Sequence, residues 1–234
     1  MPQDFALFDV RNYETLPVRE GYREWVATYE DTVLDEMDLC LLDGLRSMDW
    51  AEVRRAVDLA CGTGRIGAWL DERGVAEIDG VDITPEMLER ARHKEVYGSL
   101  RCADVSETGL PDASYDLAIQ VLADEHLPDL RPLYREAARL TGRDGRFVIV
   151  GYHPHFLMSG IPTHFDRPSG ESVAIASFVH QFSEHVQAAS DAGWTLLELN
   201  ERLVDDDWIA HKPKWERYRH RPVSYVMVWR PSSA

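Results

Sequence analysis

Two patterns of apolar and polar residues alternate along residues 54–151, one typical of strands and one typical of helices. Short apolar runs typical of buried strands are separated by segments in which apolar residues recur every three or four positions, as on one face of a helix. Strands that alternate with helices predict an α/β fold, a doubly wound and mostly parallel sheet covered by helices. We expect strands at 56–60, 78–83, 100–103, 115–122 and 145–151, and helices at 68–74, 85–94 and 130–140.

Two segments that flank this core have other patterns. Apolar residues at helical spacing predict one or two amphipathic helices over residues 20–48, which would form an N-terminal helical lid. Residues 161–165 and 172–179 flank the turn-forming tetrapeptide at 167–170, Arg-Pro-Ser-Gly. This arrangement favours an inserted β-hairpin, and periodicity alone also allows a helix there.

The last third of the chain predicts one more helix and two more strands. Ser183 is the expected N-cap of a helix that ends at Gly193, where glycine permits the left-handed cap. Residues 194–204 and 223–229 read as strands joined by a loop, and their adjacency favours an antiparallel pair at one sheet edge. The whole sheet is then expected to have seven strands.

Charge and cysteine content narrow the range of partners and compartments. The 234 residues include 41 acidic and 25 basic side chains, a formal charge of −16, which disfavours nucleic acids and anionic membranes. The basic stretch 212–221 lies beside acids and is interpreted as a solvated face. We expect no secretion signal and no transmembrane helix. Three scattered cysteines form no disulfide or zinc pattern, so a cytoplasmic location is expected.

The chain length fits a single domain over residues 1–234. No repeat, low-complexity segment or linker interrupts it, and the oligomeric state is left open. Within this domain we expect four regions: a lid at 1–50, a cofactor-binding core at 51–151, a substrate-covering insertion at 152–182, and a C-terminal helix and strand pair at 183–234.

A glycine-rich turn follows the first core strand. Gly62, Gly64 and Gly67 match the pattern GxGxxG, and Asp82 lies 15 residues further on, a spacing that permits NAD or another nucleoside cofactor. Asp58 lies four positions ahead of Gly62, where its charge would repel a pyrophosphate but attract a cation. S-adenosylmethionine carries an ammonium group and a sulfonium, so Asp58 favours this cofactor over NAD.

Four motifs in order resemble those of the class I S-adenosylmethionine-dependent methyltransferases, specifically their ubiquinone-methyltransferase-like small-molecule branch. They are VDLACGTGRIG, GVDITPEML, CADVSETGLPDASYDL and EHLPDLRPLYREAARLTGRDGRFVIV. The match covers about residues 54–151. Upstream, GYREWVATYED is similar to the tyrosine-containing lid of this family. The family's last two strands form an antiparallel hairpin, in agreement with the pattern at the C-terminus.

The resemblance implies a set of cofactor-binding positions. Asp58 would anchor the methionine end, Asp82 would bind the ribose hydroxyls, and Asp104 would meet the adenine amine. Trp25 and Tyr29 also have a simpler interpretation, as the buried stripe of an amphipathic helix. The full set of implied cofactor-binding residues is Tyr22, Tyr29, Asp58, Ala60, Gly62, Gly64, Asp82, Ile83, Met87, Ala103, Asp104, Val105, Gln120 and Val121.

Methyl transfer to a hydroxyl or protonated amine needs a base, and histidine titrates near neutrality. His153 and His126 follow the ends of two core strands, where ligands of doubly wound sheets bind, and His180 lies in the insertion. A structural role for His126 is also open. His153, His155, His164 and Asp166 could in principle bind a metal, but their spacing matches no defined motif, and no metal site is expected.

These observations favour an S-adenosylmethionine-dependent methyltransferase that acts on a small molecule, at oxygen rather than nitrogen or carbon. Two alternatives stay open: an inactive scaffold or partner subunit that binds the cofactor, and an NAD-dependent oxidoreductase. Aromatic residues in the variable segments indicate a flat or apolar acceptor, or else the core of the insertion. They are Tyr152, Phe156, Phe165, Phe178 and Trp208.

Overall fold

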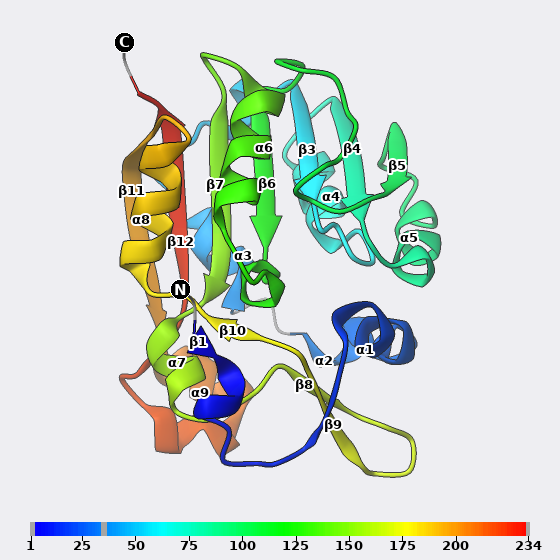
Figure 1. Cartoon of the computed structure of the whole chain (residues 1–234), viewed down its shortest axis with the longest axis vertical. Coiled ribbons are helices and arrows are strands. Elements are labelled where there is room, and N and C mark those ends of the chain that lie inside the picture. Colours follow the sequence, from blue (N-terminus) through cyan, green and yellow to red (C-terminus); the bar gives the residue numbers. More distant parts are fainter. Residues whose placement is uncertain (1–2, 34–36, 233–234) are drawn as a thin grey trace.

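The computed structural model describes residues 3–33 and 37–232 and contains a seven-stranded sheet of order β11-β12-β7-β6-β3-β4-β5 (Figure 1). All neighbours in β7-β6-β3-β4-β5 are parallel, whereas β12 is antiparallel to both β7 and β11. The predicted seven-stranded, mostly parallel sheet with an antiparallel terminal pair is therefore confirmed. Its strands are β3 (Arg55–Leu59), β4 (Glu77–Asp82), β5 (Ser99–Cys102), β6 (Leu117–Val121), β7 (Arg146–Tyr152), β11 (Trp194–Leu203) and β12 (Pro222–Pro231).

Helices cover both faces of this sheet, as Figure 1 shows. Helices α6 and α8 pack on one face and α3 and α4 on the other. The helices of the described chain are α1 (Val18–Trp25), α2 (Tyr29–Thr32), α3 (Leu39–Asp43), α4 (Arg65–Glu72), α5 (Pro85–Arg92), α6 (Arg131–Thr141), α7 (Pro154–Met158), α8 (Phe182–Asp191) and α9 (Asp206–His211), with 3-10 turns η1 (Phe5–Leu7), η3 (Trp50–Glu52), η4 (Asp124–His126) and η5 (Pro213–Tyr218).

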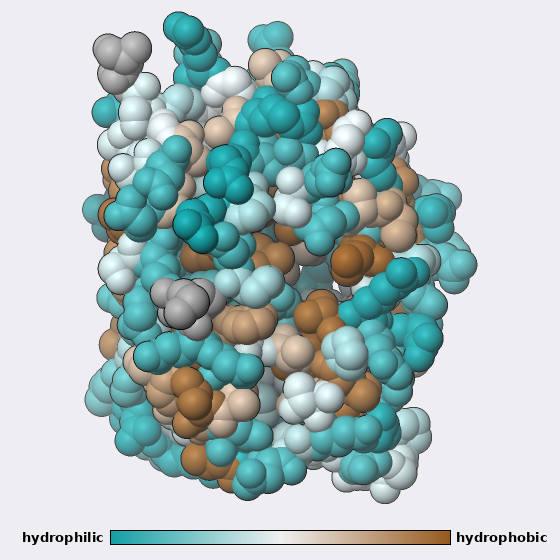
Figure 2. Space-filling model, viewed as in Figure 1, coloured by the Kyte–Doolittle hydropathy of each residue, from teal (hydrophilic) through white to brown (hydrophobic). Residues whose placement is uncertain are grey.

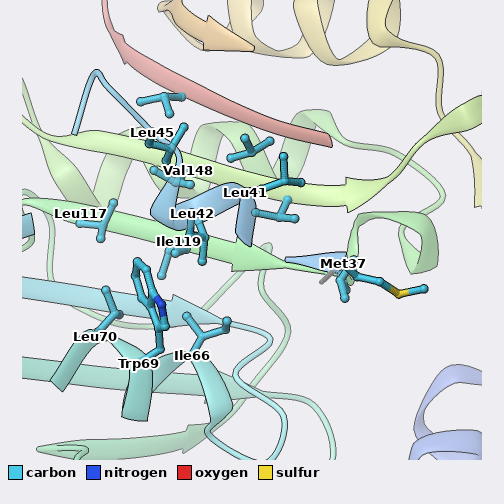
Figure 3. Packing of buried hydrophobic residues seen from close by; sticks show 14 of the residues in the cluster. Met37, Leu41, Leu42, Leu45, Ile66, Trp69, Leu70, Leu117, Ile119 and Val148 are labelled. Atoms are coloured by element: carbon cyan, nitrogen blue, oxygen red, sulfur yellow. The ribbon is translucent and has the colours of Figure 1, made fainter. Parts of the chain in front are cut away.

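The alternation of side chains along each strand divides the core into two clusters. Leu117, Ile119 and Val148 face α3 and α4, whereas the adjacent residues Ala118 and Phe147 face α6 and α8. Figure 3 shows part of the first cluster, in which Leu41 and Leu42 of α3 and Ile66, Trp69 and Leu70 of α4 pack on the same face of the sheet around Ile119. Because both faces are buried, the strands carry the nearly continuous apolar runs seen in the sequence.

A smaller cap lies beyond the carboxyl ends of the parallel strands (Figure 1). Strand β9 (Ser172–Ile175) forms the predicted hairpin with β8 (His164–Asp166) and pairs in parallel with β2 (Glu14–Leu16). Helix α1 packs on β9 so closely that a Cβ atom at Gly21 would lie 2.8 Å from Ile175 Cγ1. The N-terminal lid and the insertion thus form one unit, with Trp25, Phe165 and Ile175 in a shared core.

Several element boundaries differ from the sequence-based expectation. The segment 20–48 contains short helices rather than one or two long ones; its residues 34–36 lie outside the described part of the chain. The expected strand 172–179 divides at Ser177, and β10 (Phe178–Val179) pairs instead with β1 (Gln3–Asp4). The loop before β12 contains α9 and η5.

The N-cap of α8 is another correction. Gln181 rather than Ser183 caps α8, because Gln181 and Glu184 form a reciprocal capping box. Gly193 has the left-handed conformation expected after this helix, with φ of +80°. None of the helices in the described part of the chain is long and apolar enough to cross a bilayer.

Candidate active site

A cavity of about 220 Å³ lies at the carboxyl ends of β3, β4 and β6, beneath α1. Figure 2 shows this face hollowed between the strand ends and α1, with hydrophobic side chains at the rim. We call it the strand-end cavity. Eleven of the cofactor positions expected from the sequence line it: Tyr22, Tyr29, Ala60, Gly62, Asp82, Ile83, Met87, Asp104, Val105, Gln120 and Val121.

The backbone at the rim of this cavity is bent sharply at two strand ends. Gly62 has φ of +52° after β3, and a Cβ atom placed there would meet no atom within 4 Å. Ala60 and Leu122 also have positive φ, +60° and +52°, although neither is glycine. An alanine or leucine pays a strain energy of about 1–2 kcal/mol in this conformation, and such strain is concentrated at functional sites.

Two acidic side chains occupy one end of the cavity. Asp82 ends β4, and its carboxylate accepts hydrogen bonds from Gly62 N–H at 2.9 Å and Thr84 N–H at 2.8 Å. Burial raises the pKa of Asp82, and these two hydrogen bonds oppose the rise. Asp104 follows β5, with Ser106 as its hydrogen-bond partner. Each carboxylate retains lone pairs that can accept hydrogen bonds from a ligand in the cavity.

Asp58 does not line the cavity, contrary to the expectation that it faces the methyl donor. Its carboxylate is 1% exposed, lies beneath the glycine turn, and accepts a hydrogen bond of 2.7 Å from the Tyr97 hydroxyl. Alternation along β3 explains this position, because Asp58 shares the face of Ala56, which packs toward α4. Gly64 and Ala103 also lie outside the lining.

Tyr97 explains part of the glycine pattern. A Cβ atom at Gly67 would overlap the Tyr97 ring, and Cβ atoms at Gly80 and Gly64 would lie 2.9 Å and 3.0 Å from it. These three glycines therefore form a slot that admits the ring and lets its hydroxyl reach Asp58. Tyr97 could not be predicted from the sequence, because a single tyrosine in the turn between α5 and β5 belongs to no periodic pattern or motif.

The buried carboxyl of Asp58 predicts an unusual dependence of stability on pH. Burial raises its pKa to about 7, whereas in the unfolded chain it titrates near the ordinary value of about 3.9. Between these pH values the folded state binds a proton that the unfolded state has lost, so the free energy of unfolding falls as pH rises from about 4 to about 7. We expect Asp58→Asn to flatten this slope in urea unfolding experiments.

Asp144→Asn, in an exposed loop, is the control and should leave the slope unchanged. A wild-type slope that is retained in Asp58→Asn would show that Asp58 is ionised when folded.

His126 joins the lid, the core and the insertion at the edge of the strand-end cavity. Its Nδ1–H donates to the carbonyl of Ala176 at 2.8 Å, so its Nε2 is unprotonated and accepts a hydrogen bond of 2.8 Å from the Tyr22 hydroxyl. Burial lowers the pKa of His126 to about 4 and keeps the Tyr22 phenol neutral by raising its pKa. Tyr22 and His126 are thus a neutral donor–acceptor pair that both line the cavity.

His153 and His180, the other two candidate bases, lie away from this cavity. His153 caps α7: its Nδ1 accepts from His155 N–H at 3.0 Å, and its Nε2–H donates to Glu201 at 2.7 Å. His180 donates Nε2–H to the Leu127 carbonyl at 2.7 Å. The structure therefore does not support either residue as the base.

The structure does not bring the candidate metal ligands together into a metal site within the described residues. His164 contacts its own loop through the carbonyl of Pro162. No cluster of three His, Cys, Asp or Glu side chains suited to a metal occurs within 3–33 and 37–232.

Two buried carboxyls precede His126 in η4. Asp124 accepts a hydrogen bond from Tyr225 at 2.8 Å, and Glu125 accepts one from Thr163 at 3.2 Å, yet each retains one oxygen without a partner among the described residues. Burial and the neighbouring Asp124 raise the pKa of Glu125 to about 8. Glu125 Oε1 lies 3.5 Å from His126 Nε2, so an ionised Glu125 would stabilise a positive charge on that imidazole.

The parallel sheet, with its antiparallel terminal pair and a glycine-bent cavity at the strand ends, defines a Rossmann-like methyltransferase fold. Residues 57–149 match the family model described as a methyltransferase domain. An uncharacterized methyltransferase of Emericella nidulans is 27% identical, covering 88% of each chain. The malonyl-[acyl-carrier protein] O-methyltransferase of Halorhodospira halophila is 28% identical, covering 81% of this chain and 63% of that protein.

A solved structure of a methyltransferase has a similar fold. The S-adenosylmethionine-dependent methyltransferase from Mesorhizobium loti superposes with a TM-score of 0.68 at 23% identity, covering 86% of this chain and 99% of that one. The family match and these similarities support a class I S-adenosylmethionine-dependent methyltransferase, with S-adenosylmethionine as its cofactor. The NAD-dependent alternative is thereby set aside.

Proposed function

We propose that the protein transfers a methyl group from S-adenosylmethionine to an oxygen atom of a small-molecule acceptor. The observation that carries this proposal is the Tyr22–His126 pair, which places an unprotonated imidazole behind a phenol at the cavity wall. Oxygen acceptors need such a group because the hydroxyl proton must leave. The similarity to an O-methyltransferase supports the choice of oxygen.

The lining residues fit S-adenosylmethionine. Asp82 would accept hydrogen bonds from the ribose hydroxyls and Asp104 from the adenine amine, with apolar side chains such as Met87 against the base. Tyr22 and Tyr29 would face the methionine end, where aromatic rings stabilise a cation. When bound, the cofactor supplies an electrophilic methyl group on a positively charged sulfur.

The chain's contribution to the reaction is alignment and removal of one proton. As a bound cofactor gives up its methyl group, Tyr22 Oη would accept the proton of the acceptor hydroxyl, and Tyr22 would pass its own proton to His126 Nε2. The products are a neutral thioether, a methyl ether and an imidazolium. Once the oxygen has bonded to the methyl carbon, it carries a positive charge, and its proton is far more acidic than that of an imidazolium with a pKa of about 4. His126 is therefore a strong enough base to accept that proton.

The proposal is tested by supplying ¹³C-methyl-labelled S-adenosylmethionine with a panel of phenols, amines and enols. We expect S-adenosylhomocysteine to form with phenols, and the NMR shift of the labelled carbon to identify a methoxy group. Turnover confined to amines would overturn the choice of oxygen, and no turnover with any acceptor would favour the inactive scaffold.

Asp82→Asn is expected to weaken binding of S-adenosylhomocysteine by about 1–3 kcal/mol, the range for lost hydrogen bonds to a charged group. Isothermal titration calorimetry measures the change. Asp79→Asn, a substitution of the same kind earlier in β4 and outside the cavity lining, is the matched control. Equal affinities in the two variants would show that the ribose does not contact Asp82.

A further inference from the structure

A second cavity, of about 360 Å³, lies beside the strand-end cavity. Its wall includes Tyr152 at the end of β7, Phe156 of α7, Trp25 of α1 and Trp215 of η5. The rings of Phe156 and Trp215 stack with centroids 5.6 Å apart and planes 13° from parallel. A wall of parallel and tilted aromatic rings suits a flat, apolar molecule of the size that small-molecule pockets accommodate.

The rim of this cavity is cationic in an acidic protein. Arg11, Lys212, Lys214 and Arg217 line it, and its described lining residues include no aspartate or glutamate. Acidic residues outnumber basic ones 41 to 25 in the whole chain. Basic side chains gathered at one site raise the local concentration of anions. We call this site the basic cavity.

Three of these cations are not neutralised by acids in the described chain. Arg11 contacts the Tyr13 hydroxyl, Arg217 lies 4.7 Å from the Tyr218 ring centroid, and Lys214 has no ion pair to a described acid. Arg219 of the same segment, by contrast, is paired with Glu216 and Asp206. The segment 212–221, interpreted from the sequence as a solvated face, therefore separates into a paired part and a part directed at the basic cavity.

The two cavities share a wall. Trp25 lines the basic cavity and stacks on Tyr22, which lines the strand-end cavity, with ring centroids 5.8 Å apart. Thr163 also lines the basic cavity and donates a hydrogen bond to Glu125, the residue before His126. The Tyr22–His126 pair thus lies at the border between the two cavities.

From this arrangement we infer that the basic cavity binds the methyl acceptor, and that the acceptor is a flat, apolar molecule with a carboxylate or phosphate group. This inference rests on the proposed function. The aromatic rings hold the flat part of the acceptor and the cations at the rim hold its oxyanion. The hydroxyl at the other end reaches Tyr22 at the border of the strand-end cavity, where a bound cofactor would present its methyl group. Charge-assisted contacts of this kind give an anionic acceptor a clear advantage over a neutral one.

Calorimetry with 6-hydroxy-2-naphthoate, the corresponding naphthyl phosphate and the neutral naphthamide tests the inference in the presence of S-adenosylhomocysteine. We expect one anion to bind at least about tenfold more tightly than the amide, and the better anion identifies carboxylate or phosphate. Lys214→Gln/Arg217→Gln should remove this preference, and 0.5 M salt should reduce it. Arg143→Gln/Arg230→Gln, an equal charge change at exposed positions away from the cavity, should retain it.

Arg11→Gln provides a second variant on a separate segment of the rim, in case the double variant fails to fold. Equal binding of anions and amide by the wild type, or an unchanged preference in both rim variants, would overturn the inference. If the preference is found but no labelled product forms, the basic cavity stands as an anion site and the proposed methyl transfer falls. If neutral acceptors are methylated as well as anionic ones, methyl transfer stands and the basic cavity is not the acceptor site.

Discussion

Tyr22→Phe is expected to lower kcat about a hundredfold, the lower range for loss of a positioned proton-transfer group. Phenylalanine retains the ring that lines the strand-end cavity but loses the hydroxyl that bonds to His126 Nε2 and that would take the acceptor's proton. Binding of S-adenosylhomocysteine should therefore change little. Tyr115→Phe removes a phenol that donates to Asp79, before β6 and outside the cavity lining, and should leave kcat within a factor of two.

The pH profile separates a proton-transfer role from a purely structural one. Because the pKa of His126 is about 4, its imidazole is unprotonated throughout the neutral range, so wild-type kcat should be flat from about pH 8 to 5 and fall as pH approaches 4. In Tyr22→Phe this acid limb should disappear together with the rate. A loss of kcat with the limb retained would remove Tyr22 from the proton path.

Gly67→Ala is expected to destabilise the fold by about 3 kcal/mol, at the upper end for overpacking. The new methyl group would overlap the Tyr97 ring, and moving this ring would break its hydrogen bond to the buried Asp58. Elsewhere in a helix the same substitution stabilises by about 1 kcal/mol. Urea unfolding measures the difference in the free energy of unfolding between Gly67→Ala and the wild type.

Removing the ring should relieve the clash. In a Tyr97→Ala background, Gly67→Ala should be neutral or stabilising, which gives a coupling energy of several kcal/mol in the double-mutant cycle. Tyr97→Phe separates the hydroxyl from the ring and should cost about 1–3 kcal/mol, because it leaves Asp58 without that donor. Additive effects of Gly67→Ala and Tyr97→Ala would show that the glycine slot has another cause.

The sequence predicted the parallel core well, because its strands carry apolar runs and its turns carry glycine, and both are local signals. Most of the lining of the strand-end cavity was implied by the resemblance to the methyltransferase family, whose motifs lie at the ends of these strands. Asp58 shows the limit of this reasoning. Its distance along the chain from Gly62 indicated a ligand contact, but the face of β3 on which it lies directs it to Tyr97 instead.

The roles of the histidines depend on hydrogen bonds to distant residues, which no sequence pattern reveals. His153 follows β7 at the position expected for a base, yet it caps α7 and pairs with Glu201, a residue 48 positions away. His126 owes its tautomer to Ala176 in the insertion and to Tyr22 in the lid. Three distant segments must converge before the protonation state of this imidazole is defined.

By itself, the sequence determined the order of strands and helices, the glycine bend and the acids at the strand ends, because each depends on residues within a few positions of one another. Only the tertiary structure decided which histidine meets the cavity, what Asp58 contacts, and that cations from two ends of the chain surround aromatic rings. Burial, tautomers and electrostatic fields depend on neighbours in space, and folding brings those neighbours from segments that the linear pattern does not connect.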